Sequence, residues 1–303
     1  MKTMQLKPLV AALLSLGLIA SVPSFADDSA LPAEPQAKSE ATESVQPQVD
    51  AKATEQAAEK RKKITADAIE AVNETKHALT LLDENKPDEA LAALEKVTGK
   101  LELILARDPK LSLAPVDVEV VTHDLLASPD TVKAVIKEAE DYLEDGEIQK
   151  ARPLVASLAS EIVFRTTSIP LATYPDAIKD VAPLIDEGKI EEAKAALQVA
   201  LNTLVVTTDD VIPLPLLRAE SLLKKAEALS ENEERTVKDN ETLAKQLEDA
   251  RNQLKLAELL GYGDKKSFEP LYEQIDQIEE KTAGGKGGKG WFDKVKQQLS
   301  DLI

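Results

Sequence analysis

The stretch that decides the fold is LDENKPDEALAAL at residues 82–94, which recurs as LEDGEIQKARPLV at 143–155 and IDEGKIEEAKAAL at 185–197. Each copy starts with a large apolar residue and has Gly or Asn three positions later, then Ala, then a second large apolar residue. Gly and Asn tolerate the left-handed conformation that ends a helix, and the small Ala lets a second helix pack closely. The pattern therefore predicts three antiparallel helical hairpins.

The three copies do not form a regular array, because successive copies begin 61 and 42 residues apart. Tetratricopeptide arrays, whose hairpin turn is similar, repeat every ~34 residues. Duplication of one ancestral hairpin and convergence on the same turn are the two alternative explanations of the copies. Between the hairpins lie apolar segments punctuated by proline, at 111–120, 166–171 and 205–217. Proline disfavours helix, so we expect extended connectors that lie across the helices or pair as one short β-ribbon. The fold class is mainly α.

The composition excludes several classes of function. The chain has 303 residues, a net charge of −18, no Cys and two His. Without Cys there is no disulfide scaffold, thiol catalysis or Cys-bound metal, and two His cannot form a three-histidine site. An excess of acidic residues argues against nucleic acid, whose phosphates require Lys and Arg. We expect no cofactor and no metal.

The N-terminus has the features of a secretory signal peptide. A short basic region is followed by an apolar run at 9–22, and small residues precede a cleavage site between Ala26 and Asp27. A membrane anchor is the alternative, but the run is shorter than the ~20 residues of a span. No later run is long and apolar enough for stable membrane insertion. The sequence therefore predicts a protein of the Gram-negative periplasm.

Composition divides the rest of the chain. Residues 27–55 have few large apolar side chains and are predicted to be a disordered spacer. Residues 56–282 form the helical domain. The Gly- and Lys-rich run at 283–290 is typical of a flexible linker. Residues 291–303 form an amphipathic helix that needs an apolar groove on its own subunit, a neighbour or a client. Association with a membrane, where aromatic residues favour the interface, and a disordered solubilising tail are the alternatives.

Catalytic and metal motifs are weak. The adjacent pair His123 and Asp124 lacks the nucleophile turn and oxyanion hole of a triad. His77 follows Glu74 on a polar helix face. Asp209-Asp210 lacks the ligand run of a calcium loop, and Gly284–Gly290 lacks the Ser or Thr of a phosphate loop. We expect a protein that is not an enzyme.

Four strings occur in an order that resembles the YfdX family of exported enterobacterial proteins: KLELILARDP at 100–109, LAPVDV at 113–118, IPLATYPDAI at 169–178 and IPLPLLRAE at 212–220. The resemblance covers about 60–280. It implies a mostly helical, oligomeric periplasmic protein linked to acid and drug stress, with chaperone-like or small-molecule binding. It transfers no catalytic residue.

These observations predict a non-enzymatic, periplasmic stress-response protein with chaperone-like client binding, or alternatively a small-molecule (drug or metabolite) binding protein. Partners would be unfolded proteins or small hydrophobic ligands, and the chain would be a homo-oligomer. Mild acid would protonate many carboxylates and modulate client binding, unless the acidity only keeps the protein soluble. The predicted client-binding residues are the apolar ones of the connectors and the tail: Leu111, Leu113, Val116, Val118, Ile169, Leu171, Ile212, Leu214, Leu216, Trp291 and Phe292.

Overall fold

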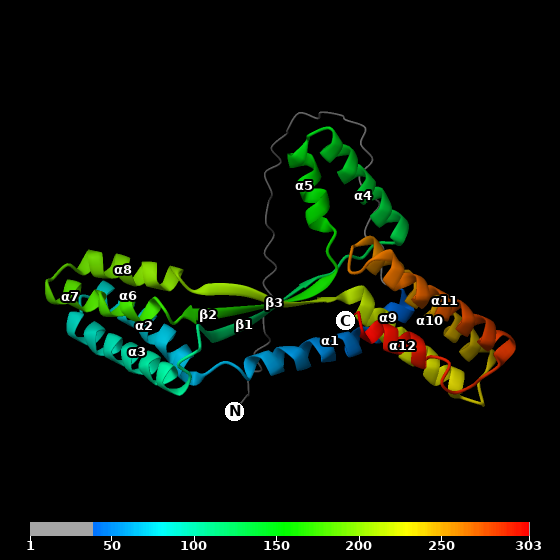
Figure 1. Ribbon diagram of the computed structural model, residues 1–303, viewed down its shortest axis with the longest axis horizontal. Helices are drawn as coiled ribbons and strands as arrows, with labels where there is room; N and C mark the ends of the chain where they lie inside the picture. The colour runs from blue at the N-terminus through cyan, green and yellow to red at the C-terminus, as the bar shows by residue number, and fades with distance from the viewer. Residues whose placement is uncertain (1–38, 303) are drawn as a thin grey trace, which may run out of the picture. The chain divides into compact units, whose positions relative to one another are not determined.

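The computed structural model describes residues 39–302, so the signal peptide expected over 1–26 and its cleavage site at Ala26 and Asp27 lie outside the described residues. The chain is mainly helical, as the sequence predicts (Figure 1). The elements in chain order are α1 (Glu40–Arg61), α2 (Ala66–Asp83), α3 (Pro87–Arg107), β1 (Leu113–His123), α4 (Pro129–Glu144), α5 (Ile148–Ser157), β2 (Glu161–Pro170), α6 (Tyr174–Lys179), α7 (Val181–Asp186), α8 (Ile190–Asn202), β3 (Val205–Pro213), α9 (Leu214–Glu231), α10 (Val237–Leu259), α11 (Lys265–Thr282), the 3-10 turn η1 (Ala283–Gly285) and α12 (Asp293–Ser300).

The three predicted hairpins are α2–α3, α4–α5 and α7–α8, and their turns have the same geometry. Asn85, Gly146 and Gly188 have φ of 56°, 76° and 74°, which is the left-handed conformation expected at the end of a helix. In each turn the next residue donates its N–H to a carbonyl five residues earlier, at N···O distances of 2.8 to 2.9 Å. The conformational requirement of the turn therefore explains the recurring Gly or Asn.

We expect Gly188→Ala to lower the free energy of unfolding by about 1–2 kcal/mol, because a Cβ is disfavoured in the left-handed region. The matched control is Gly99→Ala in the middle of α3, where a Cβ would meet nothing within 4 Å. That change should stabilise by roughly 0.5–1 kcal/mol. Urea unfolding midpoints measure both. Equal effects of the two variants would contradict the role of the turn.

The three connectors supply the strands of one antiparallel sheet in the order β1-β2-β3, so the β-structure is larger than the short ribbon expected. The third connector is extended only as far as Pro213, because α9 begins at Leu214 with Pro215 in its first turn, where a helix accepts proline. The strands have 11, 10 and 9 residues. The register of β1 and β2 shifts between Pro115 and Asp117. Proline has no N–H to donate to the sheet, and a bulge is one of the few places where a strand accommodates it.

Buried apolar side chains form three cores. The first, which we call the hairpin core, joins α2, α3 and α6–α8. The second, the C-terminal core, joins α9–α12 with Val45 of α1. The third, the sheet core, joins one face of β2 and β3 to α1 and α9 through Val49, Phe164 and Leu217. Each core buries side chains from segments that are far apart in the sequence.

The spacer predicted over 27–55 is wrong from Glu40 onward, because α1 occupies 40–61. Val45 and Val49 are 0% and 1% exposed. Few large apolar residues are needed, since only one narrow stripe of α1 packs on the cores. The described elements belong to one compact unit that includes α1 and α12, so the domain is also larger than 56–282.

The predicted linker at 283–290 is held to the chain, not free. Arg235 donates to the carbonyl oxygens of Gly285 and Lys286, at 2.9 and 2.8 Å. At Gly287 a Cβ would lie only 2.6 Å from the Ser230 carbonyl oxygen, so the glycine permits a close approach of two backbones. Hydrogen bonds to the backbone that composition does not reveal therefore anchor this segment.

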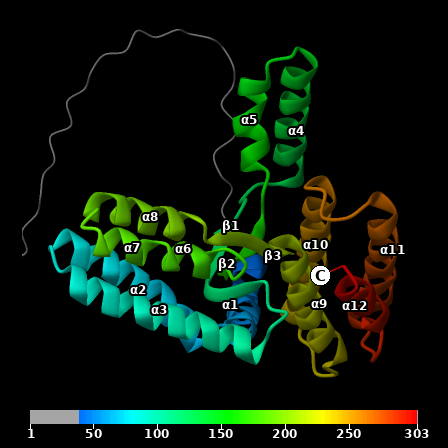
Figure 2. The same ribbon diagram turned by 60° about the vertical axis from the view of Figure 1, so that its left-hand side comes forward.

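The tail at 291–303 docks on its own subunit, one of the three places that the sequence left open. α12 lies beside α9 and α11 (Figure 2). Phe292, Val295 and Leu299 are all 0% exposed in the C-terminal core. Lys296 adds an ion pair of 2.6 Å with Glu227 of α9. The Gly- and Lys-rich run thus returns the chain to a groove of its own domain.

Candidate functional site

Most of the predicted client-binding residues are buried in this structure, as expected for apolar segments that lie across the helices. Seven of them are at most 5% exposed, and these cannot reach a client in this conformation. The half-buried ones are Leu111, Leu113, Val116 and Trp291. The buried ones are Val118, Ile169, Leu171, Ile212, Leu214, Leu216 and Phe292.

Leu111 and Leu113 instead line an apolar pocket of about 380 Å³ between the end of α3 and the start of β1. Asp108 and Pro109 end α3, and the N–H of Leu111 bonds to the Asp108 carbonyl at 3.1 Å. This turn carries the chain from helix to strand and leaves a hollow beside it. The residues that line the hollow are Lys63, Thr65, Ile104, Arg107, Asp108, Leu111, Leu113, Ala114 and Pro115.

Two cations lie at the edge of this apolar pocket. Arg107 forms an ion pair with Asp67 of α2, and Lys100 donates to the same carboxylate at 3.0 Å. These hydrogen bonds from Lys100 and Arg107 lower the pKa of Asp67. Lys63 is exposed, and none of the carboxylates whose side chains the structure describes lies within 4 Å of its ammonium. The pocket thus combines an apolar lining with the ammonium group of Lys63, which is placed to form an ion pair with an anionic ligand.

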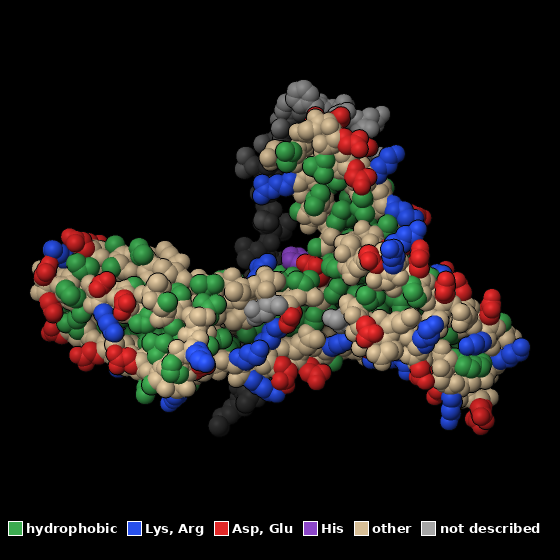
Figure 3. Space-filling view, viewed as in Figure 1, with side chains coloured by type: hydrophobic (Ala, Val, Ile, Leu, Met, Phe, Trp, Pro, Cys, Tyr) green, Lys and Arg blue, Asp and Glu red, His purple; other side chains and the backbone are tan. Residues whose placement is uncertain are grey.

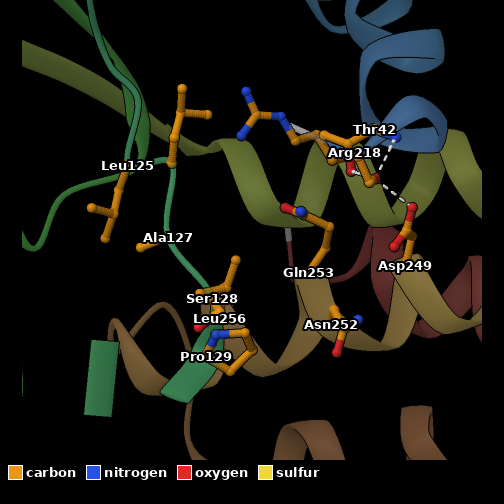
Figure 4. A pocket seen from close by; sticks show the side chains of 12 residues that line it. Thr42, Leu125, Ala127, Ser128, Pro129, Arg218, Asp249, Asn252, Gln253 and Leu256 are labelled. Carbon is orange, nitrogen blue, oxygen red and sulfur yellow. Dashed lines mark hydrogen bonds between the residues drawn. The ribbon is translucent and has the colours of Figure 1, made fainter. Parts of the chain in front are cut away.

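A second, polar pocket of about 160 Å³ lies where α1, α9, α10 and the segment before α4 meet. Figure 4 shows Thr42, Arg218 and Asp249 on one side and Leu125 to Pro129 on the other. Its polar groups bond to one another: the N–H of Thr42 donates to Ser39, whose hydroxyl donates to Asp249 at 2.5 Å. This pocket is a joint between elements in which Thr42, Ser39 and Asp249 bond to one another, but Arg218 Nε and Gln253 Oε1 are buried without a hydrogen-bond partner among the described residues.

The buried Arg218 is the centre of that joint, and its main partner is Asp124 of the adjacent pair His123 and Asp124. Its guanidinium donates to both oxygens of Asp124, at 2.9 and 2.8 Å, and to Gln46 of α1 at 3.1 Å. Asp124 is therefore engaged with Arg218, and His123 is exposed at the end of β1. An isolated Arg within the apolar run LPLLRAE was the signal for this pair, and the sequence reasoning missed it.

Among residues 39–302 no group of three or more His, Asp or Glu side chains could hold a metal ion. His77 is exposed, and Asp210, part of the weak calcium motif, forms an ion pair with Lys60. Within the same residues no helix has both the length and the apolar character needed to cross a membrane.

The family model described as YfdX protein matches residues 71–210, from within α2 to β3. This part of the chain is therefore similar to the YfdX family. The matched part contains the hairpins, most of the sheet and the apolar side of the pocket at Leu111 and Leu113. The resemblance was expected over about 60–280, but the match ends at residue 210. The helices α9–α12, and Arg218 with them, lie beyond it.

A solved crystal structure of Salmonella Typhi YfdX is also similar. It is 15% identical, covers 49% of this chain and 91% of the Salmonella chain, and has a TM-score of 0.33. No curated protein matches the chain.

Glu220 of α9 links this helix to α1 and gives a pH-dependent prediction. Lys224 and Lys52 donate to its carboxylate at 2.7 and 3.1 Å. Burial alone would raise the pKa of Glu220, but these hydrogen bonds outweigh burial and hold the pKa below its usual 4.5. A carboxyl group whose pKa is lower in the folded protein than in the unfolded chain stabilises the fold at every pH above its unfolded pKa. That stabilisation is lost as the pH falls through the pKa of the folded state.

We therefore expect Glu220→Gln to cost about 1 kcal/mol at pH 7 and progressively less below pH 4.5, the usual value of this carboxyl. Urea unfolding midpoints at pH 7, 5, 4 and 3 measure the difference. The control is Glu269→Gln, whose side chain is 58% exposed and lies 3.8 Å from Lys265. If the cost of Glu220→Gln stayed the same as the pH was lowered, the ion pairs of the ionised carboxylate would not be what stabilises the contact between α9 and α1.

Proposed function

We propose that this protein is a non-enzymatic binding protein for small amphipathic molecules, and that the apolar pocket at Leu111 and Leu113 is the binding site. The observation that carries the proposal is a hollow of about 380 Å³ with an apolar lining and the cation of Lys63 at its edge. Small-molecule sites in proteins are mostly apolar clefts of roughly 300–1,000 Å³ with a few polar groups. The ligand would have an apolar body and one anionic group.

Binding is tested with two probes of equal chain length, decanoate and decanol, by calorimetric titration and thermal melting. We expect saturable, one-to-one binding of both, tighter for decanoate. Leu113→Gln should weaken both at least about tenfold, because burying a Leu-sized apolar contact is worth about 1.5–3 kcal/mol. Lys63→Met should weaken only decanoate. The control is Val199→Gln, a residue 62% exposed on α8, which should change neither.

Non-saturable binding, or equal effects of Leu113→Gln and Val199→Gln, would contradict the pocket. If Lys63→Met left the preference for decanoate over decanol unchanged, the site would be apolar only and the anionic group of the ligand would have no recognised partner.

Chaperone-like client binding is the second candidate, supported by exposed apolar residues on the α4–α5 hairpin: Leu143, Ile148 and Val155 are 50%, 62% and 53% exposed. The test is light scattering from an aggregating client at pH 7 and pH 4. Suppression that is stronger at pH 4 and lost in Leu143→Glu/Val155→Glu supports an acid-modulated chaperone. No suppression at either pH would retire it.

We further propose that the protein acts in the periplasm in response to acid or drug stress. The support is the apolar leader before Ala26, together with the YfdX match. Mass spectrometry of the periplasmic fraction should find a mature N-terminus at Asp27. An intact leader in the cytoplasmic fraction would contradict this location.

A further inference from the structure

The α4–α5 hairpin lies outside the three cores of the described chain. Only Val132, Ala139 and Ala151 of its side chains are buried, and none of them belongs to a core. Its two helices have apolar stripes that face each other, but a pair of helices covers each stripe on one side only. In Figure 3 hydrophobic side chains gather along this hairpin at the surface.

The internal repeat shows what normally covers such a hairpin. The α2–α3 and α7–α8 hairpins pack on each other through α2 and α8 and share the hairpin core. At the first position of the repeat, Leu82 and Ile185 are 1% and 4% exposed, whereas Leu143 of α4 is 50% exposed. At the last position, Leu94 and Leu197 are 4% and 0% exposed, whereas Val155 of α5 is 53% exposed. Two hairpins of this pattern thus bury their apolar positions on each other, while the third has no partner hairpin within residues 39–302.

The charges of α4–α5 are arranged so that two such hairpins complement each other. Residues 138–147, at the tip, contain six acidic and no basic residues. The remainder of the hairpin, 129–137 and 148–157, contains four basic residues and one acidic residue. An antiparallel pairing would place the acidic tip of each hairpin against the more basic base of the other, whereas a parallel pairing would bring the two acidic tips together.

We propose that the α4–α5 hairpin is a self-association surface, and that it packs antiparallel on the α4–α5 hairpin of a second copy about a two-fold axis. A two-fold interface uses the same patch on both subunits. The result is an intermolecular four-helix bundle that repeats, between chains, the packing that the other two hairpins achieve within the chain. Leu143, Ile148 and Val155 become buried in it.

Sedimentation equilibrium of the purified protein over a wide range of concentration tests the proposal. We expect the mass to rise to that of a dimer and Leu143→Glu/Val155→Glu to weaken association at least about tenfold. The control is Val199→Glu, which introduces the same charge at a residue 62% exposed on α8 and should leave association unchanged. Circular dichroism checks that each variant is folded.

A monomer at all concentrations, or a dimer that withstands the double substitution while folded, overturns the proposal. Orientation is tested by cross-linking, because the chain has no Cys of its own. A short bismaleimide should join Ile148→Cys to Val135→Cys in a mixture of the two variants more readily than it joins either variant to itself. Preferential joining of Ile148→Cys to itself would indicate a parallel pairing and overturn the antiparallel one.

Discussion

Arg218→Ala is expected to lower the free energy of unfolding by about 3 kcal/mol, because it leaves the carboxylate of Asp124 in the protein without its cation. The Arg218 side chain is 3% exposed and that of Asp124 is 25% exposed. Partial hydration of Asp124 keeps the expected cost at the lower end of the range for buried pairs. The substitution also removes the hydrogen bond to Gln46, and with it one link between α1 and α9.

Chemical denaturation of Arg218→Ala and of Arg251→Ala separates a buried pair from an exposed one. Arg251 forms an ion pair with Asp276, but its side chain is 33% exposed, so its loss should cost less than about 1 kcal/mol. The double variant Arg218→Met/Asp124→Leu should recover most of the loss, because it removes both buried charges. Equal costs for the two single variants would mean that Arg218 is not the centre of the joint.

Phe164→Ala is expected to cost about 3–5 kcal/mol, the usual range for removing a buried aromatic side chain. Phe164 is 0% exposed on the middle strand, opposite Val120 of β1 and Asp210 of β3. It joins the sheet to Val49 of α1 and to α9. The cavity left by Ala would open between these elements, so we also expect faster proteolysis within α1.

Two variants calibrate that measurement by urea unfolding. Phe164→Leu keeps most of the apolar volume and should cost less than about 1.5 kcal/mol. Val206→Ala changes a residue of β3 that is 61% exposed, and should stay within about 0.5 kcal/mol. If Phe164→Ala were as mild as Val206→Ala, the sheet core would contribute little to the attachment of α1.

The local features of the fold follow from the sequence. The left-handed turns at Asn85, Gly146 and Gly188 require Gly or Asn whatever surrounds them, and so the hairpins are visible as a repeated string. The extended connectors follow from proline in the same way, since the restriction acts within one or two residues. Only their pairing into a three-stranded sheet required knowledge of which segments meet.

The candidate site was predictable only in part. Leu111 and Leu113 attract attention as apolar residues beside prolines, and they do line the pocket. Whether an apolar residue faces a hollow or a core depends on segments far away in the chain. Ile212, Leu214 and Phe292 have the same predicted role as Leu111 and Leu113, but they are buried in cores. Lys63 and Arg218 gain their importance from neighbours that no local pattern identifies.

The sequence by itself therefore determined the mainly helical class, the hairpin turns and the YfdX resemblance, because each depends on short-range conformational preference or on ordered strings of residues. The tertiary structure alone decided that 40–61 is a helix and that 291–303 docks on its own subunit. It also decided which hairpin is left exposed. These outcomes depend on burial between distant segments, and a stripe as narrow as Val45 and Val49 suffices once a matching surface is available.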